Sequence, residues 1–251
     1  LFMKIISWNT NHWQSKNQDN GFWEYVDNSL DPDIAFFQEI KPKQKVPGFI
    51  GEKHKPVEKI SNAGTYIWEH IDPKRKWGTG IFTKNLPIRE LNIKTDYQGC
   101  IGAAEVPYNG ELFTFISLYA ILENGYSITT LHRMFSDLTP ILDGKKDSTG
   151  KKRKIILGGD FNASLQWDEQ QPGESHKIMF ERLENFGMID LLLDKYNQPV
   201  HTWRRKNTRR KWQLDYMFVS KNIADRIKDI NVLHDQQIEQ LSDHNPIEVV
   251  L

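Results

Sequence analysis

The chain has 251 residues, of which 38% are hydrophobic and 26% charged, and its 33 basic side chains balance 33 acidic ones. A chain of this length buries about 70–75% of its unfolded surface and needs neither disulfides nor a structural metal to fold. The single cysteine, Cys100, excludes an internal disulfide and favours a reducing compartment. No apolar run approaches the roughly 20 residues that cross a bilayer, and the opening residues lack a signal-peptide pattern. We therefore expect a soluble, cytoplasmic protein that does not insert into membranes.

In chain order, short runs rich in Ile, Val, Phe and Tyr predict strands. They lie at 4–8, 33–38, 78–82, 112–119, 154–159, 214–220 and 246–251. Several of these runs are apolar nearly throughout, which is typical of strands covered on both faces.

Apolar residues at helical spacing predict helices over 21–30, 126–142 and 175–186. Strands with interspersed helices indicate an α/β fold with layered sheets. Because no repeat, low-complexity segment or long linker interrupts this pattern, we expect residues 1–251 to form a single domain.

A few polar residues stand where the predicted strands end. Asn9, Glu39 and Tyr119 lie at the carboxyl ends of their strands, and Asp160 and Asn162 follow the strand at 154–159. A single Asp or Asn at such a place is most often a turn residue or a helix cap. A buried Glu39 beside an apolar run is harder to explain in this way, because an unpaired buried carboxylate is costly.

Asp215 and the Asp243–His244 pair lie instead at the amino ends of their strands. If these last strands run antiparallel to the earlier ones, all of these polar groups gather at one edge. Carboxylate and amide oxygens are ligands that Mg²⁺ and Mn²⁺ prefer. The sequence has no Cys pair, no HExxH motif, no GxxxxGKS/T loop and no GxSxG motif. Metal-assisted hydrolysis with Mg²⁺ or Mn²⁺ is therefore the predicted chemistry.

Five motifs carry a family resemblance. They are SWNTN (7–11), FFQEIK (36–41), GGDFNAS (158–164), LDYMFVS (214–220) and LSDHNPI (241–247). In this order they resemble the endonuclease/exonuclease/phosphatase superfamily of exonuclease III-like and deoxyribonuclease I-like enzymes. The resemblance implies a four-layered α/β sandwich, in which two mixed β-sheets pack face to face with helices on the outside. It also implies a divalent-metal phosphoesterase.

The same resemblance implies a metal side of the site. Glu39 resembles the main metal ligand, and Asn9 resembles the amide that organises the metal site. Asp243 resembles a further carboxylate on the metal side.

The resemblance also implies the catalytic groups. Asp160 would orient or deprotonate the attacking water, and Asn162 would contact the phosphate. His244 would lie on the scissile phosphate with Asp215 as its carboxylate partner, and a carboxylate beside an imidazole favours its charged form. Tyr119 occupies a place where nuclease relatives carry a tyrosine. We expect direct in-line attack by water, without a covalent enzyme intermediate.

The segment 201–216 resembles the loop in which abasic-site endonucleases place an aromatic pocket. Trp203 and Trp212 stand at matching places, and Arg204 and Arg209 belong to a basic cluster at 204–211. Aromatic rings beside cations suit stacked bases and phosphates, but a solvated loop with Trp203 at the sheet edge explains the segment equally well. Departures from the abasic-endonuclease pattern, such as Leu122 where an amide should stand, favour a more generic nuclease.

Three functions are consistent with the sequence. The first is a metal-dependent phosphodiesterase that hydrolyses nucleic acid, which the tyrosine and the basic cluster favour. The second is a phosphatase or phosphodiesterase for small phosphorylated molecules or lipid headgroups, which the neutral overall charge favours. The third, a catalytically inactive binding module, is disfavoured because every expected catalytic position holds suitable chemistry. No obligate protein partner is evident.

Overall fold

The computed structural model describes residues 2–13, 21–41, 66–72, 75–144, 146–170, 173–204 and 211–251. Two six-stranded sheets form the centre of the molecule. The first sheet has the order β11 (Asp229–Val232), β12 (Ile247–Val250), β1 (Lys4–Asn9), β2 (Ile34–Ile40), β4 (Arg75–Thr83), β3 (Tyr66–Asp72). The second has the order β5 (Arg89–Glu90), β6 (Ile101–Tyr108), β7 (Glu111–Tyr119), β8 (Ile155–Asp160), β10 (Asp215–Ser220), β9 (Met188–Asp190).

Both sheets are mixed. Strand β1 runs parallel to β2, and β7 runs parallel to β8. The later strands reverse direction, since β12 pairs antiparallel with β1 and β10 pairs antiparallel with β8. The carboxyl ends of the early strands and the amino ends of the late strands therefore share one edge, so the condition on which the expected polar edge depends is met.

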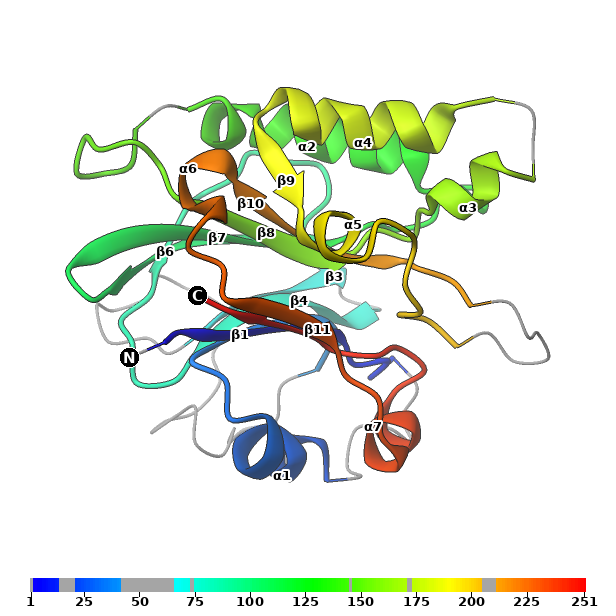
Figure 1. Cartoon of the computed structure of the whole chain (residues 1–251), viewed down its shortest axis with the longest axis horizontal. Helices are drawn as coiled ribbons and strands as arrows, with labels where there is room; N and C mark the ends of the chain where they lie inside the picture. Colours follow the sequence, from blue (N-terminus) through cyan, green and yellow to red (C-terminus); the bar gives the residue numbers. More distant parts are fainter. Residues whose placement is uncertain are drawn as a thin grey trace.

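Helices cover the outer faces of the two sheets (Figure 1). Helices α2 (Ile128–Leu142) and α4 (Ser175–Asn185) lie over the second sheet, while α1 (Phe22–Tyr25) and α7 (Gln236–Leu241) lie under the first. Shorter helices are α3 (Leu165–Asp168), α5 (Leu191–Tyr196) and α6 (Lys221–Ala224). The predicted four-layered α/β sandwich is confirmed. In the described residues, no helix combines the length and apolarity needed to cross a membrane.

Apolar side chains fill the space between the sheets. Phe36 from the first sheet meets Phe115 from the second, with ring centroids 5.9 Å apart, and both are fully buried. A second apolar cluster joins the second sheet to α2 and α4, and a third joins the first sheet to α1 and α7. Burying a side chain of this kind stabilises the fold by about 1.5–3 kcal/mol, so the sandwich provides a rigid base for its polar edge.

The helix predicted over 21–30 differs from the structure. Only α1 is an α-helix, and Val26–Leu30 continues it as a π-helix. The amide of Asp31 donates to the carbonyl of Val26 at 2.8 Å, and Asp31 has a φ of 43°. This wider turn keeps both Val26 and Leu30 buried. The spacing of apolar residues alone does not distinguish a π-helical turn from a regular α-helix.

Several strands were not predicted from the sequence, and β6 is the longest example. It contains Gly, Ala and Pro and lacks a clear apolar alternation, yet it pairs with β7 from Ile101 to Tyr108. The connection is the two-residue turn Asn109–Gly110, in which φ is 49° and 77°. An Asn-Gly pair is a strong hairpin signal because both positions require positive φ, so the turn indicated this hairpin better than the strand composition did.

Candidate active site

The strand directions bring polar residues from both sheets to one edge. Asp160 is the last residue of β8 and lies opposite Tyr119 in β7 and Asp215 in β10. Asn9 ends β1 in the other sheet, and its Nδ2 donates to Asp160 Oδ2 at 2.8 Å. One hydrogen bond therefore connects the two sheets at the point where their polar residues meet.

Glu39 reaches this edge because β2 is irregular there. Glu39 has a φ of 51°, and the pairing of β2 with β4 shifts register between Phe37 and Ile40. The chain after β1 holds the bulge, since the amide of Thr10 donates to the carbonyl of Gln38 at 2.9 Å and the amide of His12 to that of Glu39 at 3.2 Å. A bulge of this kind re-aims a side chain. Glu39 thus lies within the strand rather than after it.

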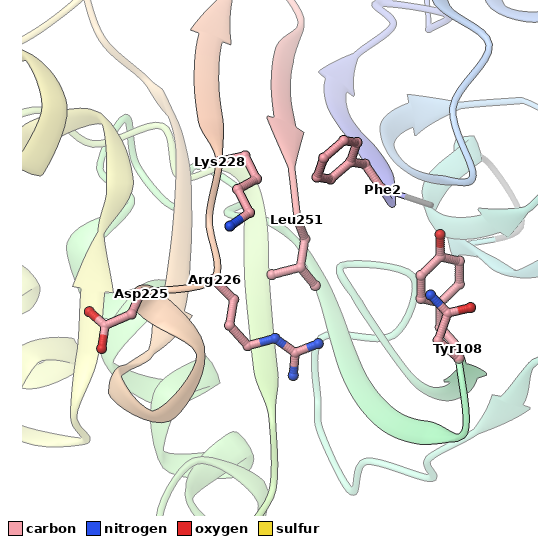
Figure 2. A pocket seen from close by; sticks show the side chains of 7 residues that line it. Phe2, Tyr108, Asp225, Arg226, Lys228 and Leu251 are labelled. Atoms are coloured by element: carbon pink, nitrogen blue, oxygen red, sulfur yellow. The ribbon is translucent and has the colours of Figure 1, made fainter.

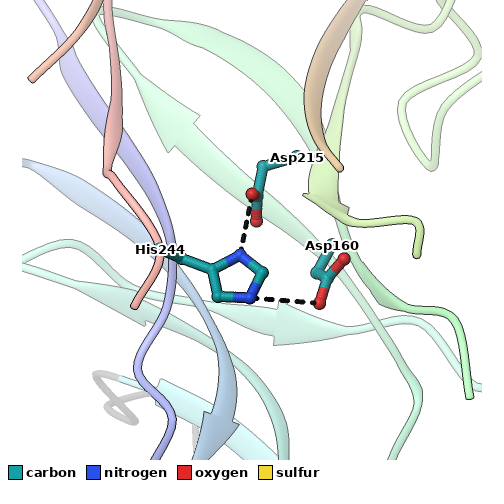
Figure 3. Close-up of side chains that lie close together, drawn as sticks. All are labelled: Asp160, Asp215 and His244. Carbon is teal, nitrogen blue, oxygen red and sulfur yellow. Dashed lines mark hydrogen bonds and ion pairs between the residues drawn. The ribbon is translucent and has the colours of Figure 1, made fainter. Parts of the chain in front are cut away.

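His244 lies between two aspartates (Figure 3). Its Nδ1 is 2.8 Å from Asp215 Oδ2 and its Nε2 is 4.0 Å from Asp160 Oδ2. The indole Nε1 of Trp8 donates to the carbonyl of His244 at 3.0 Å. Ser242 Oγ accepts from the amide of His244 at 3.1 Å and donates to the carbonyl of Asn9 at 2.7 Å. These contacts fix the histidine relative to the end of β1.

The charges at this edge shift each other's pKa. Burial alone would lower the pKa of His244, but the carboxylates of Asp215 and Asp160 outweigh it and raise that pKa to about 10. Burial and the charge of Asp160 raise the pKa of Glu39 to about 8, and His244, Asn9 and Tyr119 partly oppose this rise. Burial also raises the pKa of Asp160, although the charge of His244 lowers it. The imidazole is therefore held in its charged form near neutral pH.

Tyr119 borders the acidic group. Its ring is 8% exposed and meets Trp77 edge-on, with centroids 5.4 Å apart. Burial, together with the charges of Glu39 and Asp160 and a hydrogen bond to Glu39, raises the pKa of the phenol well above its usual value. The phenol is therefore a donor at neutral pH.

The donor set fits a hard divalent cation. Glu39, Asp160 and Asp215 are buried, at 8%, 1% and 1% exposure, and one imidazolium faces these three carboxylates. Asp160, Asp215 and His244 place carboxylate oxygens and a ring nitrogen within 4.8 Å of one another, but a protonated imidazole cannot coordinate a cation, so only the oxygen atoms are available as ligands. Gathering buried carboxylates costs free energy unless positive charge compensates them. A cation held by oxygen atoms supplies that charge.

Asp243 and Asn162 lie at the same edge but use some of their polar atoms within the protein. Asp243 Oδ1 accepts from Asn11 Nδ2 at 2.7 Å, and its Oδ2 accepts from Trp203 Nε1 at 3.3 Å. Asn162 has a φ of 45°, and its Nδ2 donates to the carbonyl of Ala120 at 3.0 Å. Asn11 was not expected to take part in the site, although Asn11 is the second Asn of the SWNTN motif.

The aromatic and basic residues proposed for substrate contact have different surroundings. Trp203 is half-buried, with its ring centroid 6.3 Å from that of His244, whereas Trp212 is buried against Trp167 at 5.5 Å. Arg204 directs its guanidinium at the protein, donating to Asn245 Oδ1 and to the carbonyl of Ser242. Arg209 lies outside the described residues.

Other residues position the site without a distinctive sequence signal. Thr202 Oγ1 accepts from the amides of Leu214 and Asp215, at 2.9 and 3.0 Å, and so holds the start of β10. Trp8 is fully buried, and the hydrogen bond from its indole to the His244 carbonyl supports the site. A buried Trp generally finds a partner for its N–H, and the sequence does not say which.

A small hollow of about 270 Å³ lies at the other end of the sheets (Figure 2). Phe2, Tyr108, Arg226 and Lys228 are among its lining residues. Arg226 Nη1 is already paired with Glu111 Oε2 at 2.8 Å. The hollow lies before the start of β1, whereas Asn9 marks the end of that strand, so it is separate from the acidic edge.

Comparison with known proteins agrees with this geometry. The family model described as endonuclease-reverse transcriptase (Exo_endo_phos_2) matches residues 113–248, which is more than half of the chain. The chain therefore belongs to this family of the endonuclease/exonuclease/phosphatase superfamily.

Individual known proteins resemble this chain in sequence or in structure. A DNA-(apurinic or apyrimidinic site) endonuclease from Dictyostelium discoideum is 26% identical and aligns with 99% of this chain and 70% of its own length. The crystal structure of an AP endonuclease from Leishmania major gives a TM-score of 0.71 at 16% identity, covering 100% of this chain and 87% of that one. A 3′ phosphatase from Neisseria bound to a product DNA hairpin gives 0.71 at 20% identity, covering 98% of both chains.

Proposed function

We propose that this protein hydrolyses phosphodiester bonds in nucleic acid, with Mg²⁺ or Mn²⁺, by direct in-line attack of water. The observation that carries the proposal is the contact of Asn9 and Asp160 beside the His244–Asp215 pair. This contact places a group assigned to metal binding beside the groups assigned to proton transfer. Family membership and the Dictyostelium relative support nucleic acid as the substrate class.

The roles follow from the chemistry of each group. We assign Glu39, Asn9 and Asp243 to hold a divalent ion, which would offset negative charge on the phosphate and on the leaving oxygen. His244, kept charged by Asp215, donates a hydrogen bond to a phosphoryl oxygen as negative charge develops there. Asp160 accepts a proton from the attacking water as the water oxygen bonds to phosphorus. The bond from phosphorus to the leaving oxygen breaks, and that oxygen takes a proton from solvent. Asn162 contacts the phosphate.

Two further assignments accompany this function. Asn9 and His244 are far apart in the sequence but belong to the same proposed active site. This supports a single domain over residues 1–251. Cys100 is buried, and burial raises the pKa of its thiol to about 12, which disfavours the nucleophilic thiolate. A cytoplasmic location is consistent with this single thiol.

A substrate panel tests the proposal. The purified protein is incubated with supercoiled DNA, abasic duplex, RNA, inositol phosphates and nucleotides, each with and without EDTA. We expect metal-dependent cleavage of DNA or RNA that stops on chelation. Turnover of small phosphates alone would replace nucleic acid with the second substrate class, and cleavage that continues in EDTA would contradict the metal assignment.

A further inference from the structure

The loop that follows Tyr119 at the end of β7 exposes two apolar side chains. Leu122 is 49% exposed and Tyr126 is 64% exposed. Isolated exposed apolar residues are ordinary on protein surfaces, but these two lie on one tight turn. We call residues 122–126 the apolar tip.

The apolar tip is a closed two-residue hairpin turn. The amide of Glu123 donates to the carbonyl of Tyr126 at 2.9 Å, and the amide of Tyr126 donates back at 3.0 Å. Between them, Asn124 and Gly125 have φ values of 52° and 84°, as in a type I′ turn. The Glu123 carboxylate also accepts from Tyr97 Oη at 3.1 Å. The exposed side chains therefore stand on a fixed backbone.

Both ends of the apolar tip are attached to the segment that carries Asp160. The amide of Ala120 donates to the carbonyl of Asp160 at 2.8 Å. On the other side, Ser127 Oγ donates to the carbonyl of Asn162 at 2.5 Å. The apolar tip is therefore anchored on both sides to the segment that carries Asp160 and Asn162.

The chemistry of the apolar tip suits a base rather than a phosphate. Its single charged residue is Glu123, whose carboxylate pairs with Arg133 at 3.8 Å, and residues 122–126 contain no Lys or Arg to bind a phosphate. Leucine and tyrosine side chains instead offer apolar area and a ring face, on which bases stack with little sequence preference. In an intact duplex the neighbouring bases already cover both faces of each base. Only an unpaired or unstacked base therefore leaves a face open to these side chains.

We propose that the apolar tip contacts an unpaired or unstacked base beside the scissile phosphate, and that it selects nucleic acid containing such bases over intact duplex. This inference rests on the proposed nuclease function and adds its substrate class. Leu122 and Tyr126 are specificity residues in this assignment, whereas the turnover chemistry stays with Asp160 and His244.

The test compares two DNA duplexes that differ only in a short unpaired bubble at the cleavage site. Leu122→Ser, Tyr126→Ser and the double variant are measured beside Tyr126→Phe, which keeps the ring. Ile178→Ser, on α4 at 53% exposure, is the matched control for removing an exposed apolar side chain. Thermal unfolding checks that each variant folds as the parent does.

We expect the parent protein to prefer the bubble. The serine variants should lose about 10-fold or more in kcat/KM on the bubble, the range that one lost base-stacking contact gives, and less than about 2-fold on the intact duplex. Tyr126→Phe and Ile178→Ser should retain the preference. The salt dependence should not change, because no phosphate contact is removed.

Two results separate the inference from the function on which it rests. A parent protein that cleaves nucleic acid but has no bubble preference, or serine variants that lose equal activity on both duplexes, would overturn the role of the apolar tip alone. A parent protein that cleaves no nucleic acid in the same assay would overturn the proposed function and this role with it.

Discussion

Asn9 Nδ2 donates to Asp160 Oδ2 across 2.8 Å and so joins the last residue of β1 to the last residue of β8. These strands belong to different sheets, and both side chains are 1% exposed. A hydrogen bond to a charged group contributes about 1.5–3 kcal/mol. The position of Asp160 relative to the first sheet therefore depends on this contact.

Asn9→Ala should reduce turnover in a protein that still folds. Loss of this bond leaves Asp160 without its link to β1, and about 1.5–3 kcal/mol corresponds to roughly 10- to 150-fold in kcat. Steady-state kinetics on the preferred nucleic acid measure the effect, and thermal unfolding serves as the control. Unchanged kcat in a folded variant would remove Asn9 from the site.

Asp160→Asn should abolish turnover while leaving the fold intact. A missing general base costs about 10²–10⁴-fold in rate. The midpoint of thermal unfolding should stay the same or rise, because the substitution removes one of several buried carboxylates that repel each other. Asp229→Asn, at an exposed ion pair with Lys195, is the control and should retain full activity.

His244→Ala should also inactivate the protein. The imidazole donates to the phosphate in the proposed mechanism, and alanine removes this donor while leaving Asp215 without its partner. We expect a loss of at least 10²-fold in kcat, with far-ultraviolet circular dichroism like that of the parent. An active His244→Ala protein would contradict the assigned role.

Metal binding should stabilise the folded protein through Glu39. A ligand that binds only the folded state adds about 2.7 kcal/mol at 100 times its dissociation constant, so Mg²⁺ should raise the unfolding midpoint and EDTA should reverse the rise. Glu39→Gln should weaken this response, while Glu24→Gln on the exposed surface of α1 should keep it. An equal metal response in both variants would place the ion elsewhere.

Glu105 should make stability depend on acid pH. Its carboxylate is fully buried in β6 and pairs with Arg89 and with Arg153, the latter at 2.8 Å, while Ser148 Oγ donates to it at 2.6 Å. Although burial alone raises the pKa of Glu105, these partners lower it overall. A carboxyl group with a lowered folded-state pKa stabilises the protein above its unfolded pKa, about 4.3, and this contribution is lost as the pH falls further.

Glu105→Gln tests this expectation. At pH 7 the variant should lose about 3 kcal/mol in the free energy of unfolding, because Arg153 loses its buried partner. The difference from the parent protein should shrink below about pH 4. Glu111→Gln, at a half-exposed ion pair, should cost less than about 1 kcal/mol. Urea unfolding at several pH values measures the free energy of unfolding of both variants and of the parent protein. If the loss in Glu105→Gln did not depend on pH, the charge of the carboxylate would not be its cause.

The amino-acid sequence by itself indicated the most apolar strands, the order of the motifs and the family. Apolar runs predict strands such as β1 and β8 because burial requires them, and Asp160 and Asp215 follow or begin such runs. The resemblance carried by the motifs then gave each polar residue an expected role. The Asn-Gly turn before β7 was also readable, although the strand β6 that it implies was not predicted.

Only the tertiary structure decided which of these groups meet and how they point. The bulge at Glu39, the indole of Trp8 on His244 and the inward guanidinium of Arg204 all depend on contacts between residues far apart in the chain. The exposure of Leu122 and Tyr126 is likewise a property of the folded surface. Local sequence patterns report the periodicity of burial, whereas hydrogen-bond partners, pKa values and exposure arise from long-range packing, which no local pattern encodes.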